Sequence, residues 1–122
     1  MSATRELIEN YIRSWNETDP LRRRALIERV CDEHVAYTDP LAQVRGWEGI
    51  DATIAAAQGM FPGHRFALAG TVDVHHDIAR FQWQLGAPGA GEPLVIGFDV
   101  VELDAGRLRR ISGFLDKVPQ AA

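Results

Sequence analysis

The chain has 122 residues, of which 46% are hydrophobic and 25% charged, and its formal net charge is -4. This length suits one domain with a core of its own, and the composition excludes a disordered or fibrous chain. The negative charge argues against a nucleic-acid backbone as partner, and no apolar run approaches the length of a membrane span. We therefore predict a single domain, 1–122, that binds neither nucleic acid nor membrane.

The sequence carries one cysteine, Cys31, which cannot form an internal disulfide, and an unpaired thiol suits a reducing compartment. The first residues lack the apolar core of a signal peptide, so we expect a cytoplasmic protein. The basic cluster Arg22–Arg24 has no interleaved aromatic residues for stacking on bases. We interpret it as the solvated face of a helix.

Apolar residues at helical spacing predict an amphipathic helix from about Thr4 to Glu17. Asp19 is placed to cap a second helix, which begins at Pro20 and runs to about Val30. From His34 to Pro40 the pattern changes to a period of two, which predicts a short strand. A third helix is expected from roughly Trp47 to Gln58.

The rest of the chain predicts strands separated by turn residues, at about 66–74, 79–85, 94–103 and 107–116. Three glycines and two prolines between Gly86 and Pro93 indicate a flexible hairpin loop, and 117–122 is expected to fray. Helices followed by a meander of antiparallel strands are typical of an α+β domain. In such a domain the helices cover one face of a curved sheet.

The predicted strand 94–103 is apolar on both faces and yet carries Asp99 at its centre. Aspartate is disfavoured in strands, and its ionised form is costly to bury, so Asp99 needs hydrogen bonds or a functional cavity. The second apolar face of this strand also needs a cover. A second subunit is the economical cover, so we expect a homodimer through the outer face of the sheet.

The histidines and hydroxyls do not form a recognisable site. His75 and His76 are adjacent and would point to opposite faces of a strand, so no metal site is expected. Ser112 lacks the surroundings of a nucleophile elbow, which argues against serine hydrolysis.

A phenol and two acids remain as candidates for catalysis. If the first helix crosses the concave face of the sheet, Tyr11 reaches the same cavity as Asp39 and Asp99. We expect that cavity to be lined by aromatic side chains, namely Trp15, Tyr37, Phe81, Trp83 and Phe114. A phenol and a protonated acid can both donate hydrogen bonds to a developing oxyanion, while an ionised carboxylate moves a proton.

Each candidate also has a structural interpretation. Asp39 can be a turn residue before a proline, and Asp99 can lie on the outer face or bond a neighbouring main chain. Tyr11 can be a core residue of an amphipathic helix, and Asp116 can be a charge at the end of a strand.

Short motifs in a fixed order suggest a family. They include Tyr-Ile-Arg-Ser-Trp-Asn at Tyr11–Asn16, Tyr-Thr-Asp-Pro at Tyr37–Pro40, Phe-Pro-Gly-His-Arg-Phe at Phe61–Phe66 and Gly-Phe-Asp-Val-Val-Glu at Gly97–Glu102. With them the sequence resembles the nuclear transport factor 2-like superfamily, in its ketosteroid isomerase and SnoaL-like polyketide cyclase branches. This resemblance implies a cone-shaped, strongly curved antiparallel sheet wrapped by three N-terminal helices around a deep apolar pocket.

The resemblance also implies roles for particular residues. Tyr11 matches the oxyanion-hole tyrosine of ketosteroid isomerases, Asp39 their general base and Asp99 their protonated acid. The implied function is a cofactor-free isomerase acting by proton transfer on a hydrophobic carbonyl compound. Asp116 fits the acid-base aspartate of SnoaL-like cyclases, which would close a ring instead. A third alternative is a module that binds a small ligand or dimerises without catalysis.

The sequence departs from ketosteroid isomerases at one point. Those enzymes support their oxyanion tyrosine with further tyrosines, whereas this chain has only Tyr11 and Tyr37. The hydrogen-bond network behind the phenol is therefore missing or different.

Overall fold

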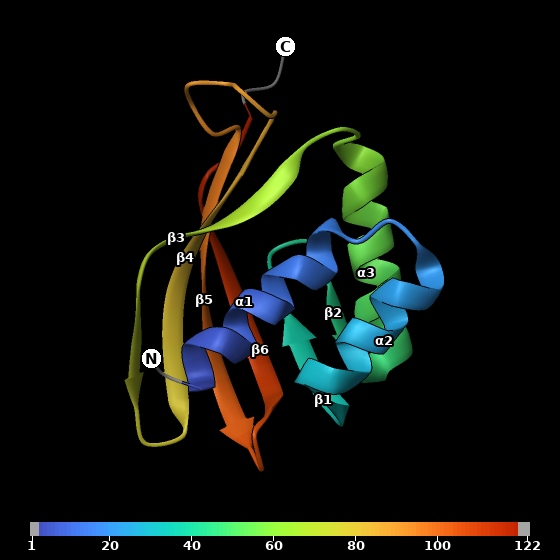
Figure 1. Cartoon of the computed structure of the whole chain (residues 1–122), viewed down its shortest axis with the longest axis vertical. Coiled ribbons are helices and arrows are strands. Elements are labelled where there is room, and N and C mark those ends of the chain that lie inside the picture. The colour runs from blue at the N-terminus through green and yellow to red at the C-terminus, as the bar shows by residue number, and fades with distance from the viewer. Residues whose placement is uncertain (1–2, 120–122) are drawn as a thin grey trace.

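Three helices lie on one side of a six-stranded sheet in the computed structural model, which describes residues 3–119 (Figure 1). The helices are α1 (Ala3–Asn16), α2 (Pro20–Val30) and α3 (Gly46–Met60). The strands are β1 (Cys31–Thr38), β2 (Gln43–Arg45), β3 (Arg65–His75), β4 (Ile78–Gly86), β5 (Val95–Asp104) and β6 (Arg107–Lys117). The predicted α+β class is confirmed.

The strands follow one another across the sheet in the order β2-β1-β6-β5-β4-β3. β3 to β6 form the predicted antiparallel meander, but β1 pairs with β6 in parallel. The prediction of an antiparallel sheet is therefore wrong at this one pair. Parallel neighbours need a long crossover, and here it runs through β2, α3 and three further strands.

The structure differs from the sequence-based prediction at β1, β2 and the end of β6. β1 begins at Cys31, directly after α2, whereas the period-two pattern placed its start at His34. β2 was not predicted, because three residues are too few to show an alternation; it pairs with β1 from Gln43 to Arg45. At the other end, Lys117 closes β6, while 120–122 of the expected frayed tail lie outside the described residues.

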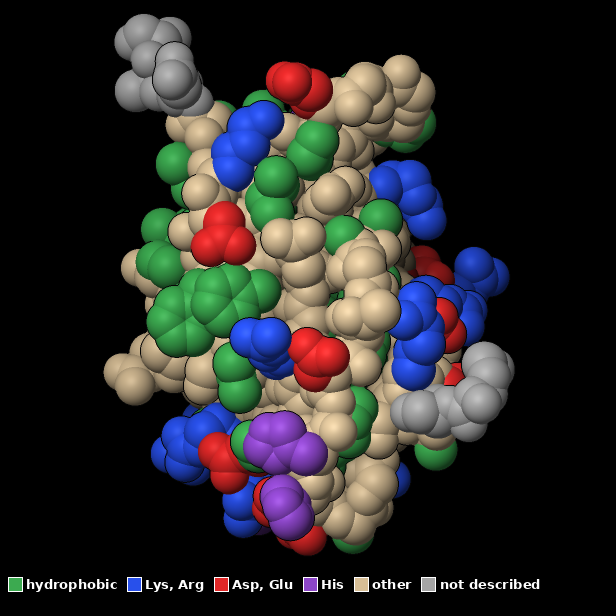
Figure 2. Space-filling model, turned by 90° about the vertical axis from the view of Figure 1, so that its left-hand side faces the viewer, with side chains coloured by type: hydrophobic (Ala, Val, Ile, Leu, Met, Phe, Trp, Pro, Cys, Tyr) green, Lys and Arg blue, Asp and Glu red, His purple; other side chains and the backbone are tan. Residues whose placement is uncertain are grey.

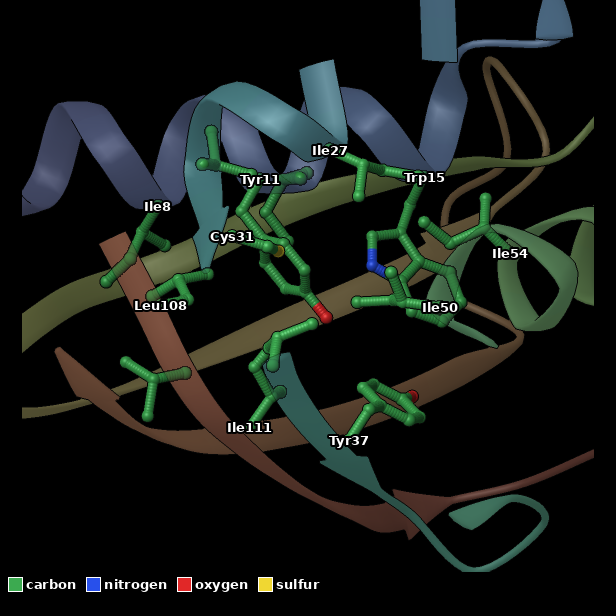
Figure 3. Packing of buried hydrophobic residues seen from close by; sticks show 14 of the residues in the cluster. Ile8, Tyr11, Trp15, Ile27, Cys31, Tyr37, Ile50, Ile54, Leu108 and Ile111 are labelled. Atoms are coloured by element: carbon green, nitrogen blue, oxygen red, sulfur yellow. The ribbon is translucent and has the colours of Figure 1, made fainter. Parts of the chain in front are cut away.

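α1 is fixed to the sheet at its C-terminal end. The Asn16 side chain donates to the Phe66 carbonyl at 2.8 Å and accepts from the Phe66 N–H at 2.7 Å. This pair of hydrogen bonds ties the C-terminal end of α1 to Phe66, the second residue of β3. Tyr11 and Trp15 consequently point from α1 into the buried cluster beneath it, as Figure 3 shows.

α2 begins as predicted but packs differently. Asp19 accepts from the Arg22 N–H at 2.9 Å, and Pro20 occupies the first turn. Arg23, however, is buried, and its Nε donates to Asp51 Oδ1 at 2.6 Å and its guanidinium to Gln58 Oε1 at 3.0 Å. The interpretation of the arginine cluster as wholly solvated is therefore wrong at Arg23, which joins α2 to α3.

Arg23→Ala should destabilise the fold by about 3 kcal/mol, because it leaves the Asp51 carboxylate and the Gln58 carbonyl without their donor. Urea denaturation measures the change. Arg22→Ala is the matched control, since Arg22 is exposed on the same helix, and should cost less than about 0.5 kcal/mol. Equal losses in the two variants would contradict a special function for the buried arginine.

No helix within residues 3–119 is both long enough and apolar enough to cross a membrane.

Candidate active site

A cavity of about 350 Å³ lies between α1, α3 and the inner face of the sheet. Most of its lining is aliphatic or aromatic. The polar side-chain groups among the lining residues are two carboxyl groups, two tyrosine hydroxyls and two indole N–H groups. No lysine, arginine or histidine of the described chain contributes to it. Seven of the predicted site residues line this cavity, namely Tyr11, Trp15, Tyr37, Asp39, Trp83, Asp99 and Phe114.

Asp99 is buried, with 6% of its surface exposed, at the centre of the inner face of β5. Its Oδ1 atom accepts a hydrogen bond from the Trp83 indole N–H at 3.1 Å. Burial raises the pKa of Asp99 to about 7; the bond from Trp83 opposes this shift and the nearby charge of Asp39 adds to it. A substantial fraction of Asp99 is therefore protonated near neutral pH.

Gly113 allows the two acids to share the cavity. It lies directly opposite Asp99 on β6. A Cβ atom at position 113 would lie 3.0 Å from Asp99 Oδ1 and 3.3 Å from Asp39 Cβ. Any side chain at this position would occupy the space between the two carboxyl groups, so the glycine keeps that space open.

Asp39 follows the last residue of β1 and is held by three donors. Its Oδ1 accepts from the Leu41 and Ala42 N–H groups at 2.8 Å each, and its Oδ2 accepts from the Tyr37 hydroxyl at 2.5 Å. Accepting from three donors is the arrangement that suits an ionised carboxylate. Burial and the bond to Asp39 raise the pKa of Tyr37, so Tyr37 remains a donor.

The Tyr11 hydroxyl is buried and has no hydrogen-bond partner among residues 3–119. Burial raises the pKa of Tyr11 well above its usual value; Asp99, Tyr37 and Cys31 add to the shift and the Trp15 side chain opposes it. A buried hydroxyl without a partner is costly. Because this one belongs to a cavity-lining residue, an acceptor atom of a bound ligand would satisfy it.

The structure does not bring Phe81 and Asp116 to this cavity. Phe81 is a core residue whose ring packs edge-on against Tyr11, with centroids 6.4 Å apart. Asp116 is exposed and borders a separate hollow that also includes Arg80 and Phe98. Phe114 reaches the cavity wall, yet it is 49% exposed and its ring stacks on Phe98.

Within the described part of the chain, no group of three or more histidine, cysteine or acidic side chains could hold a metal ion.

Comparison with known proteins decides the family. No protein-family model and no curated protein matches the chain. Among solved structures, a proposed isomerase of the SnoaL-like family from Agrobacterium tumefaciens strain C58 is 44% identical, with a TM-score of 0.87. The match covers 95% of this chain and 99% of that one. The chain belongs to the SnoaL-like family.

More distant structures share the fold of this SnoaL-like protein. A proposed ketosteroid isomerase from Kribbella flavida DSM 17836 is 17% identical over 98% of this chain and 82% of that one, with a TM-score of 0.70. A proposed SnoaL-like polyketide cyclase from Jannaschia sp. CCS1 is 20% identical over 90% and 85%, with a TM-score of 0.68. The fold is that of nuclear transport factor 2-like proteins.

Sequence reasoning missed several lining residues of this SnoaL-like protein. Gly113 was overlooked, although a glycine inside a predicted strand signals close approach of another group. Phe66, Met60 and Leu41 were also missed, because nothing in a local pattern says which apolar residues face a cavity rather than a filled core.

Asp99→Asn should make the protein more stable at alkaline pH. The pKa of Asp99 rises from 3.8 to about 7 on folding, so its contribution to stability is full below pH 4 and is lost as pH rises through 7. Relative to wild type, the variant should therefore gain up to about 4 kcal/mol between pH 4 and pH 8. Denaturant unfolding at both pH values measures this gain.

Asp104→Asn is the control for this experiment, because Asp104 is an exposed aspartate on the same strand, at the end of β5. It should show no comparable gain. If the free energy of unfolding changes with pH by the same amount in the wild type and in Asp99→Asn, Asp99 is not held in its neutral form.

Proposed function

We propose that this SnoaL-like protein is a cofactor-free isomerase that moves a proton within a neutral, hydrophobic carbonyl compound. The observation that carries the proposal is the gathering of Asp39, Asp99 and the unpartnered Tyr11 hydroxyl at one apolar cavity. In this mechanism Asp39 removes a proton from the carbon next to the carbonyl group. Tyr11 and protonated Asp99 donate hydrogen bonds to the enolate oxygen, and Asp39 returns the proton to another carbon.

The different surroundings of the two acids support the proposal that Asp39 is the base and Asp99 the hydrogen-bond donor. Asp39 accepts from three donors, which suits an ionised base. Asp99 receives one donor and is almost fully buried, which favours the protonated form. Activity should accordingly fall as pH rises through about 7, where Asp99 loses its proton.

The lining of the cavity supports the proposed class of substrate. Among residues 3–119 it offers no positively charged partner for a carboxylate or phosphate, and its two acids would repel one. Large exposed hydrophobic side chains, Leu41, Met60, Phe114 and Val118, belong to the same lining. The proposal takes the cavity as the deep pocket that a cone-shaped, strongly curved sheet would enclose.

Asp39→Asn should lower kcat/KM for a β,γ-unsaturated ketone by at least about 100-fold, because it removes the proton acceptor. Conversion to the conjugated isomer, followed by ultraviolet absorbance, measures the rate. The same assay separates the alternatives. Loss of activity in Asp116→Asn but not in Asp39→Asn would favour cyclase-like chemistry. A cavity that binds ketones without any turnover would favour a ligand-binding module.

We also propose that the outer face of the sheet forms a homodimer. Phe98 alternates with Asp99 along β5, so it lies on the outer face, where its ring stacks on Phe114 at a centroid distance of 5.0 Å. On the side of the molecule that carries β3 and β4, hydrophobic side chains stand among charges of both signs (Figure 2). Mixed charges around an apolar centre suit contact between two identical surfaces.

Light scattering at micromolar concentration should give twice the 13.5 kDa mass of one chain. Phe98→Arg should return the mass to that of one chain, because it places a charge in the proposed interface. Leu21→Arg is the control, since Leu21 is 84% exposed on α2, away from the sheet. A wild type of 13.5 kDa would overturn the dimer.

A further inference from the structure

We propose that Trp83 is a positioning residue that orients the Asp99 carboxyl group, so that the proton of this acid lies on Oδ2 and is donated from there. The inference rests on the proposed function, in which protonated Asp99 is a donor. The Trp83 N–H lies 3.1 Å from Asp99 Oδ1, and among residues 3–119 it is the one hydrogen-bond donor to this carboxyl group. An oxygen that accepts a hydrogen bond is favoured as the carbonyl oxygen of a protonated acid, which leaves Oδ2 to carry the hydrogen.

Gly97 leaves the space in which the Trp83 indole packs. The two residues lie opposite each other on β4 and β5. A Cβ atom at position 97 would lie only 2.3 Å from Trp83 Cζ2 and 2.6 Å from Trp83 Cε2. The indole therefore lies directly over the glycine backbone, two residues along the same face from Asp99. Glycine is unfavourable inside a strand, and here it permits this contact.

The rest of the indole is also restrained. The Phe66 ring packs against it at a centroid distance of 5.5 Å, and Trp83 lines the same cavity as Asp99. An indole held by Gly97 and Phe66 keeps its N–H in one direction. Trp83 therefore controls the orientation of a buried acid that no other described side chain holds by a hydrogen bond.

The other groups around Asp99 do not replace this contact. Tyr11 from α1 and Tyr37 from β1 interact electrostatically with Asp99, and Asp39 beyond the end of β1 repels its ionised form. Gly113 on β6 offers no side chain. Removing the Trp83 N–H would take away the one contact that favours ionised Asp99, so the pKa of Asp99 should rise.

Two variants remove this N–H. Trp83→Phe keeps an aromatic ring, and replacement of Trp83 by 3-benzothienylalanine keeps the bicyclic shape while sulfur takes the place of the N–H. Trp47→Phe is the control, because Trp47 donates to the Cys31 carbonyl and does not line the cavity. The readouts are carboxyl carbon NMR of Asp99 across pH and the pH profile of kcat for a β,γ-unsaturated ketone.

Both Trp83 variants should raise the midpoint of the Asp99 titration measured by NMR. The alkaline limb of the pH profile of kcat should move to higher pH by the same amount. The maximal kcat should fall by about tenfold or more, because the acid is no longer held in one orientation. The control should retain the wild-type midpoint and limb. An Asp99 midpoint that stays at its wild-type value in the benzothienyl variant overturns the inference. If the Asp99 titration midpoint rises but the alkaline limb of the kcat profile does not move, Trp83 does bond and orient Asp99, and the proposed catalytic function of Asp99 is contradicted.

Discussion

The burial of Asp99 beside a second carboxyl group is the constraint on which the rest of the site depends. An isolated buried carboxylate is too costly to keep ionised, so the acid is drawn towards its protonated form. Asp39, across Gly113, reinforces this effect by repulsion. The strand order β1-β6-β5 brings the two acids together. Asp39 follows β1, Asp99 lies on β5, and the residue of β6 between them is Gly113, which has no side chain to keep them apart.

The tyrosines of this protein are used differently from those of the ketosteroid isomerases that its sequence resembles. Tyr37 donates to Asp39 rather than supporting Tyr11, and the Tyr11 hydroxyl has no protein partner among the described residues. A phenol without a preformed partner depends on the ligand for its hydrogen bond. In the proposed mechanism, the orientation of the enolate oxygen would then depend more on Asp99 and on the Trp83 N–H that holds it.

The fold could be predicted largely from the sequence, because helical and alternating patterns are strong over long elements such as α1, β4 and β5. β2 and the parallel β1–β6 pair could not, since one is too short and the other depends on contacts distant in sequence. Within the site, Asp99 was identifiable as an acid in an apolar strand. The position of Asp116 was not, because its face depends on the register of β6 with β5.

The parallel pairing of β1 with β6 has a consequence for how the protein is made. Asp39 emerges early in synthesis, whereas Gly113 belongs to the last strand of the chain. Contacts of such high sequence separation close late and slow the folding of a domain. A chain that has not yet made β6 therefore contains both acids but lacks the strand that lies between β1 and β5, so the two carboxyl groups reach one cavity only after β6 has joined the sheet.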